Sequence, residues 1–163
     1  MIKRIISTIL AAAVIASVAV GSSRERAAAT IGGTTVATAA GAGVFPAGAS
    51  FNGIELAGGT YGVGVNSAST GTANGDLEVQ LNGNSLIGLS QWITVTGWIT
   101  QATLNADGTI TMNGTGTLDM GDGTAPTGGL ALVANLSVSG IQVTIGGTAL
   151  PMLPRSDGYI SIE

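Results

Sequence analysis

The clearest strand pattern of the chain is Asp76-Leu77-Glu78-Val79-Gln80-Leu81-Asn82-Gly83. Its apolar residues occupy every second position and polar residues fill the positions between, so an extended strand here has one apolar face and one wet face. Its last two residues, Asn82-Gly83, predict a two-residue hairpin turn, because both central positions of that turn need a positive φ. The stretch therefore indicates antiparallel β-structure.

The same alternation recurs along the rest of the chain. Ile110 and Met112 alternate with threonines, Ser139-Gly140 is a turn sequence, and Tyr159 begins a last short strand. Turn residues recur at short intervals and no helical period persists, so we expect roughly seven or eight short antiparallel strands. The fold class predicted for residues 50–163 is all-β, a single antiparallel β-sandwich of the jelly-roll or immunoglobulin-like kind. A barrel is the less favoured alternative.

The segment that contains both tryptophans, Trp92 and Trp98, has large apolar residues on both parities. The sequence after it, Asn105-Ala106-Asp107-Gly108-Thr109, suits a type I turn with its glycine in the left-handed conformation, which pairs the first residue with the last. Counting back from this turn pairs Trp98 with Gly116 and places the indole on the core face. A different loop type would slip the register by one residue and turn both tryptophans outward.

This register leaves a row of β-branched residues, Ile93, Val95 and Ile99, on the outer face of the strand. An outward row of three large apolar side chains needs a cover. The cover is expected to be the segment Thr30–Val44, either of the same chain or of a neighbour. Ile93, Val95 and Ile99 are therefore the predicted self-association face.

The chain begins as a secretory signal peptide does. Met1-Ile2-Lys3-Arg4 is a short basic head, Ile5–Val20 is an unbroken run of small and apolar residues, and small residues suited to cleavage follow. We expect residues 1–29 to be removed, with cleavage between positions 19 and 29, and the protein to be secreted to the extracellular space, the cell surface or the periplasm. An uncleaved anchor is the alternative, but the 16 residues of the run fall short of the roughly 20 that a spanning helix needs. No stable membrane insertion is expected after cleavage.

Residues 30–49 are rich in alanine, glycine and threonine and hold few large side chains. Such a composition suits a linker or an arm. Three arrangements remain open: the segment docks on its own domain, adds as a strand to a neighbour's sheet, or stays flexible.

Composition excludes most catalytic chemistry and several partners. The chain has no histidine and no cysteine, so catalytic triads that use imidazole, thiol nucleophiles and disulfides are excluded. Residues 30–163 hold one basic and eight acidic side chains, a formal net charge of −7. A surface with one cation does not neutralise a row of phosphates, so nucleic acid is not expected as a partner. We expect no enzyme; a carboxylate pair drawn from Glu55, Asp76 and Glu78 is the minor alternative.

Two kinds of binding site are candidates. Asp119 and Asp122 place acidic oxygens in one tight loop, as calcium prefers, so calcium is the one cofactor considered. Trp92 and Trp98 are six residues apart on one strand, or roughly 20 Å at strand rise. If they are exposed, they form a stacking platform for a glycan.

These observations predict a secreted, non-catalytic structural or cell-surface β-sandwich. It would self-associate into a homo-oligomer or filament, through strand addition or through the isoleucine face. The alternative is an extracellular carbohydrate-binding module with a polysaccharide as its partner. The alternative requires that Trp92 and Trp98 point into solvent.

Overall fold

The computed structural model describes residues 35–163, and within this range the chain is all strand and loop, with no helix. The strands are β1 (Thr35–Val44), β2 (Ser50–Phe51), β3 (Ile54–Ser67), β4 (Thr72–Asn84), β5 (Ser90–Leu104), β6 (Ile110–Asp119), β7 (Thr127–Ser137), β8 (Gly140–Ile145), β9 (Thr148–Ala149), β10 (Leu153–Pro154) and β11 (Asp157–Ile162). Every strand pair in this set is antiparallel. The predicted all-β, antiparallel class is confirmed.

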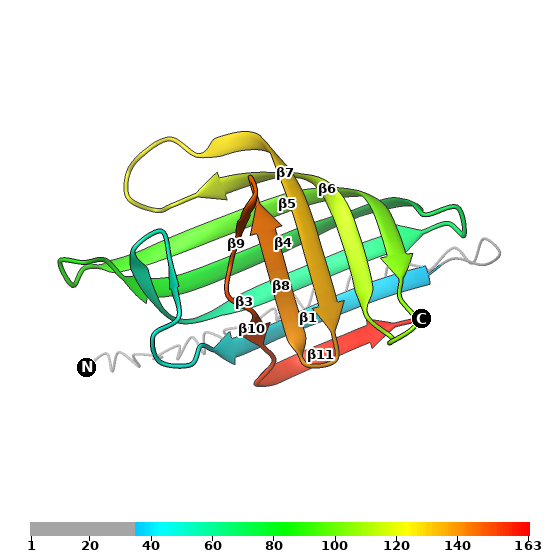
Figure 1. Ribbon diagram of the computed structural model, residues 1–163, viewed down its shortest axis with the longest axis horizontal. Coiled ribbons are helices and arrows are strands. Elements are labelled where there is room, and N and C mark those ends of the chain that lie inside the picture. Colours follow the sequence, from blue (N-terminus) through cyan, green and yellow to red (C-terminus); the bar gives the residue numbers. More distant parts are fainter. Residues whose placement is uncertain (1–34) are drawn as a thin grey trace, which may run out of the picture.

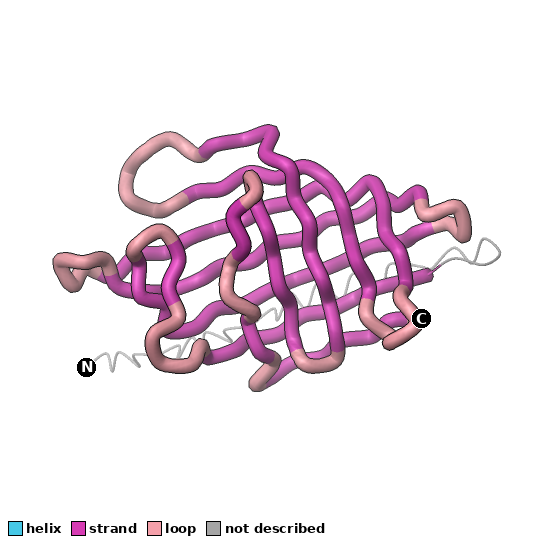
Figure 2. The backbone as a smooth tube through the Cα atoms, in the orientation of Figure 1, coloured by secondary structure: helices cyan, strands magenta, loops and turns pink. Residues whose placement is uncertain are grey.

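The strands form one continuous sheet that curls. Its order is β10-β8-β7-β6-β5-β4-β3-β1-β11, with β2 added to β3 and β9 added to β8. In Figure 1 β7 and β8 cross over the long strands β3 and β4, and Figure 2 shows most of the loops at the strand ends. The two ends of the sheet meet where β10 leads into β11: the Ser156 amide donates to the Ala42 carbonyl at 2.8 Å, and the Arg155 amide donates to the Ser139 carbonyl at 2.8 Å. A sandwich requires two separate sheets that pack face to face. The predicted sandwich is therefore not confirmed.

The core fills the concave side of the curled sheet. Leu132 of β7 reaches across to β5, where a Cβ added to Gly97 would lie only 2.8 Å from a Leu132 methyl. Gly116 of β6 also leaves space for Leu132, because a Cβ added to Gly116 would lie 2.8 Å from a Leu132 methyl. Small residues at these points let the sheet bend over its own core without steric overlap. The fully buried side chains include Leu81, Ile93, Ile99, Ile110, Met112, Leu132, Leu136, Ile141, Ile145 and Leu153.

A β-bulge in β5 reverses the predicted facing of the tryptophans. The predicted turn is present, since Leu104 pairs with Ile110 and the Asn105 amide donates to the Thr109 carbonyl at 2.8 Å. Between Ile99 and Gln101, however, the register shifts by one residue. Trp98 consequently lies opposite Thr115 rather than Gly116, and the prediction that it faces the core is wrong. An extra residue in one strand exchanges the two faces beyond it, which turn rules alone do not detect.

The predicted outward direction of Ile93, Val95 and Ile99 is wrong for the same reason. All three are 0% exposed and belong to the core. A side chain that its own chain buries offers no surface to a second copy. These residues are therefore stability determinants, and the structure gives no outer isoleucine row.

The segment from Thr35 to Val44 is β1, a strand inside the sheet. It pairs with β3 on one side and with β11 on the other. Of the three arrangements left open for the arm, docking within the same chain is the one observed for these residues. The predicted signal peptide, residues 1–29, lies outside the described residues.

The predicted hairpin turn at Asn82-Gly83 is also absent, because β4 runs on to Asn84. Gly83 serves a different purpose: a Cβ there would lie 2.3 Å from the Glu55 carbonyl of β3. The glycine thus permits close approach of the neighbouring strand. The chain turns one step later, between Ser85 and Leu89. Over residues 35–163 no helix is long and apolar enough to cross a membrane.

Candidate functional site

The outer face of β5 carries both tryptophans. Trp92 is 61% exposed and Trp98 is 55% exposed. Thr94 and Thr96 lie between them on the same face, because side chains alternate along the strand before the bulge. Six residues of strand separate the indoles by roughly 20 Å. The condition set by the carbohydrate-binding alternative is met.

Polar side chains of β4 line one side of this row. The cross-strand pairs are Asp76 with Trp98, Glu78 with Thr96, Gln80 with Thr94 and Asn82 with Trp92. Gln80 Nε2 donates a hydrogen bond of 2.7 Å to Glu78 Oε1, which fixes the direction of both side chains. Carboxylate and amide groups therefore stand within reach of any molecule that covers the indoles.

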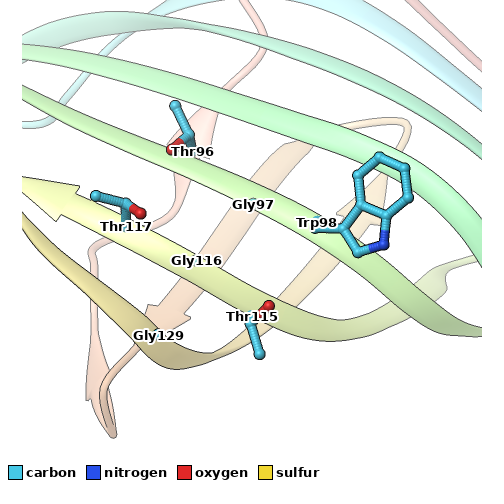
Figure 3. A pocket seen from close by; sticks show the side chains of 7 residues that line it. All are labelled: Thr96, Gly97, Trp98, Thr115, Gly116, Thr117 and Gly129. Atoms are coloured by element: carbon cyan, nitrogen blue, oxygen red, sulfur yellow. The ribbon is translucent and has the colours of Figure 1, made fainter.

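Hydroxyl groups of β6 line the other side. Thr115 pairs with Trp98, Thr117 with Thr96, and Asp119 with Thr94. Figure 3 shows the Trp98 indole and the side chains of Thr96, Thr115 and Thr117 beside one another over the backbone of β5 and β6. Trp98 is thus framed by polar groups on both neighbouring strands, whereas Trp92 has a polar partner on β4 alone. We call Trp92, Trp98 and these flanking residues of β4 and β6 the tryptophan platform.

Three shallow hollows follow the platform. One of about 320 Å³ lies over β5, β6 and β7, and is the one drawn in Figure 3. A second, of about 450 Å³, lies over β3, β4 and β5 and is lined in part by Asp76, Glu78 and Thr96. The third, about 150 Å³, lies beside Trp92. The platform is consequently a row of depressions and not a flat surface.

Glycine makes the second hollow. A Cβ added to Gly62 of β3 would meet no other described residue within 4 Å, so its small size is not required by packing. Its φ is not among the positive values found in the described chain, so its backbone does not require glycine either. A missing side chain that neither packing nor backbone explains leaves room for a ligand to approach the strand.

The carboxylate-pair alternative receives little geometric support. Glu55 pairs with Asn84, six residues along β4 from Glu78 and hence roughly 20 Å away. Asp76 and Glu78 are two residues apart on the outer face and both are exposed. A glycosidase acid lies in an apolar, enclosed setting, which this open face does not provide.

Asp119 and Asp122 accept hydrogen bonds from different residues of the loop. Asp119 Oδ1 accepts a hydrogen bond of 2.8 Å from the Gly121 amide, whereas Asp122 Oδ1 accepts from the Thr124 amide and hydroxyl at 2.9 and 2.6 Å. The hydrogen bonds from Thr124, side chain first, lower the pKa of Asp122 below its ordinary value. Within residues 35–163 no group of three or more acidic side chains gathers as a metal site would require. Calcium remains a prediction that this geometry does not favour.

The β4 residues beside the tryptophans are functional candidates that the sequence alone does not identify. The sequence predicts Asp76, Glu78 and Gln80 as the wet side of an ordinary strand and Asn82 as part of a hairpin turn. The register of β4 against β5 is what joins them to the indoles, and no local pattern encodes that register. Leu86, Ile87 and Leu89 form a second such set, and they are 92%, 80% and 63% exposed in the loop after β4. Three aliphatic residues shortly after a predicted turn were the available signal.

Comparison with known proteins gives no relative from which a function could be transferred: no family model, no curated protein and no solved structure matches this chain.

Proposed function

We propose that this protein is an extracellular carbohydrate-binding module whose ligand lies along the tryptophan platform. The observation that carries the proposal is the exposure of two indoles on one face of one strand, 61% and 55%, with polar side chains on both sides. Exposed apolar surface rimmed by polar residues is typical of interaction sites and ligand-binding grooves. No catalytic step is part of the proposal.

The chemistry of the platform suits sugar rings. A pyranose presents C–H groups on its faces and hydroxyls around its rim, so it pairs an apolar face with polar edges. An indole offers the matching apolar surface with little conformational entropy to lose. The rim hydroxyls would donate to Asp76, Glu78 and Asp119 and exchange hydrogen bonds with Gln80 and the threonines.

The spacing and charge of the platform support one class of glycan. Stacking sites roughly 20 Å apart lie farther apart than one sugar unit spans, so the ligand is an extended chain that covers several units. The flanking carboxylates of Asp76, Glu78 and Asp119 repel polyanions. We therefore propose a neutral polysaccharide as the ligand and expect no binding to uronic-acid or sulfated polymers.

Secretion belongs to the same proposal. The basic head and apolar run at the start of the chain support export. Intact mass of the protein exported from a host cell would locate the cleavage site between positions 19 and 29.

Depletion assays with insoluble neutral polysaccharides test the proposal. Wild type is expected to bind at least one of cellulose, chitin, mannan or β-1,3-glucan, and Trp92→Ala and Trp98→Ala to weaken that binding roughly ten-fold each, as loss of a central aromatic anchor does. Leu104→Ala is the matched control, because Leu104 is 47% exposed on the same strand beyond the bulge. Failure of every polymer to retain the wild type, or equal loss in the control, refutes the platform.

A structural, self-associating protein is the second candidate, and one observation favours it. Strand β11 pairs with β1 on one side, and within residues 35–163 no strand pairs with its other side. An open edge can add a strand of a second copy. Light scattering with negative-stain imaging tests this second candidate. Concentration-independent oligomers or fibres would support self-association, and a monomer at all concentrations would exclude it.

A further inference from the structure

Three hairpin loops of this protein share one backbone geometry. They span residues 68–72, 85–89 and 105–109, and in each the first amide donates to the fifth carbonyl at 2.8 to 2.9 Å. In each, the amide of the fourth residue, a glycine, donates back to the first carbonyl at 2.8 to 3.0 Å. The φ values of Gly71, Gly88 and Gly108 are 85°, 77° and 81°. All three are type I turns closed by a left-handed glycine.

The middle loop alone has aliphatic residues at its apex. The two apical positions are Ser69-Thr70 in the first loop and Ala106-Asp107 in the third, but Leu86-Ile87 in the second. Leu86 and Ile87 are 92% and 80% exposed, and the closing residue Leu89 is 63% exposed. Since small and polar residues form the same turn twice in this chain, the turn itself does not require aliphatic side chains there. An external contact is what remains to explain them.

The loop is the tip of the molecule. It connects the long strands β4 and β5 and projects at one end of the longest axis, the left end in Figure 1. Trp92 follows it by three residues on the outer face of β5, about 10 Å from Leu89 at strand rise. The arrangement places aliphatic side chains at the extremity and an exposed indole behind them.

We propose that this tip, Leu86, Ile87 and Leu89, inserts into the surface of an uncharged lipid bilayer and holds the protein there reversibly. A protein partner of standard size would need roughly 20–30 residues on each side, whereas the tip offers three exposed aliphatic side chains at one end of the molecule. A fluid apolar phase needs no complementary shape. The indole of Trp92 would then lie near the headgroups, where amphipathic aromatic rings are favoured.

Charge selects the kind of lipid. Arg155 is the sole basic side chain in residues 35–163, and its guanidinium is held at the β10–β11 connection by the carbonyls of Val138 and Gly158. Glu55 lies opposite Asn84 at the start of the loop, and Asp119 lies opposite Thr94, two residues beyond Trp92 on β5, so acidic groups stand on the tip side. Anionic headgroups would be repelled, and a zwitterionic surface such as phosphatidylcholine is the expected one.

The strength of the contact follows from its size. The tip presents three side chains of four carbons each, less hydrocarbon than one myristoyl chain, so the partition constant of that chain, on the order of 10⁴ M⁻¹, is an upper limit. The protein should therefore bind weakly and reversibly. No span of the bilayer is involved.

Vesicle flotation of the exported chain tests the proposal. Phosphatidylcholine vesicles should carry wild type upward, and addition of phosphatidylglycerol should reduce the bound fraction. The triple variant Leu86→Ser, Ile87→Thr, Leu89→Thr should lose at least ten-fold in partitioning, with an unchanged circular dichroism spectrum and urea midpoint. The matched control Ala106→Ser, Asp107→Thr, in a loop of the same geometry, should float as wild type does.

A gain-of-function variant distinguishes loss of the lipid contact from a triple variant that fails to fold. Placing Ala106→Leu with Asp107→Ile in the triple variant should restore flotation through the other loop. Trp98→Ala should leave flotation unchanged, so a lipid contact is separable from glycan binding. Absence of wild-type flotation overturns the proposal, and so does a tip-dependent change in molecular mass without vesicles, because that result makes the tip a contact between copies.

Discussion

At the scale of single residues, β5 separates a buried face from the exposed face that we propose binds glycan. Ile99 is 0% exposed while Trp98, its neighbour, is 55% exposed. Adjacent positions therefore predict opposite mutational effects: loss of stability on the inner face and loss of binding on the outer face. The two effects can be measured separately.

Ile99→Ala is expected to lower the free energy of unfolding by about 2–5 kcal/mol, because it removes buried methyl and methylene groups and leaves a cavity. Urea unfolding followed by circular dichroism measures the change. Thr96→Ala on the outer face is the control and should stay within about 0.5 kcal/mol of wild type. An Ile99 variant as stable as that control would show that the side chain is not in the core.

Tyr61 presents an unusual buried group. It is 4% exposed, and within the described chain its hydroxyl has no hydrogen-bond partner. The ring lies over Gly41, where a Cβ would be 2.5 Å from the hydroxyl oxygen. Since an unpaired buried hydroxyl costs about 1–3 kcal/mol, Tyr61→Phe is expected to raise the free energy of unfolding by about 1 kcal/mol. A destabilised phenylalanine variant would mean that the hydroxyl has a partner.

The pH dependence of stability follows from the same residue. Burial raises the pKa of Tyr61 above 10.0, and Arg155 partly opposes this. Above that pH the unfolded chain releases a proton that the folded chain retains, so the contribution of Tyr61 to stability is complete below pH 10.0 and falls as pH rises. Urea midpoints between pH 8 and 11 should fall less steeply for Tyr61→Phe than for wild type. Equal slopes would contradict this assignment.

At the scale of elements, glycine has one role in a strand and a different role in a loop. Gly62 of β3 has open space above it, and Gly108 of the β5–β6 loop has a φ of 81°. Gly62→Val is expected to leave the urea midpoint nearly unchanged but to fill the hollow beside Glu78, weakening glycan binding several-fold. Gly108→Ala is expected to cost about 1 kcal/mol through its left-handed backbone and to leave binding intact. Any other combination of the two results contradicts the roles assigned.

Sequence patterns predicted the elements better than their pairing. The alternation in β4 and the turn at residues 105–109 were predicted correctly, because both depend on local chemistry. The bulge between Ile99 and Gln101 depends on how β5 fits β6 and has no local signature. One unforeseen residue reversed the direction of both tryptophans, and with it the preference between the two functions.

At the scale of the whole molecule, closure of the sheet depends on β1. This strand pairs with β3 and β11 and buries Ala37 and Ala39. Deleting residues 35–44 would leave both neighbouring strands with unpaired backbone groups and expose core side chains, so the shortened chain is expected to be unfolded. Circular dichroism and a urea titration measure this. A cooperative unfolding transition in the shortened chain would show that the segment is dispensable after all.

The residues that surround the tryptophans could not be predicted from a single sequence. Trp92 and Trp98 were identified as a platform if exposed, but the residues that surround them come from positions 76–82 and 115–119. Such groups become neighbours only when the register of three strands is known. The curl of one sheet in place of two facing sheets was beyond local patterns too, because it depends on small residues such as Gly97 and Gly116 that admit Leu132.

The most direct test of the tryptophan platform uses the fact that the chain has two tryptophans and no more. In Trp92→Phe the emission reports Trp98 alone, and in Trp98→Phe it reports Trp92 alone. Both variants should emit at long wavelength and be quenched by acrylamide, and titration with a soluble neutral polysaccharide should shift both emissions to the blue and protect them. Emission that is already blue-shifted and unquenched, or that no neutral glycan alters in either variant, would contradict the account.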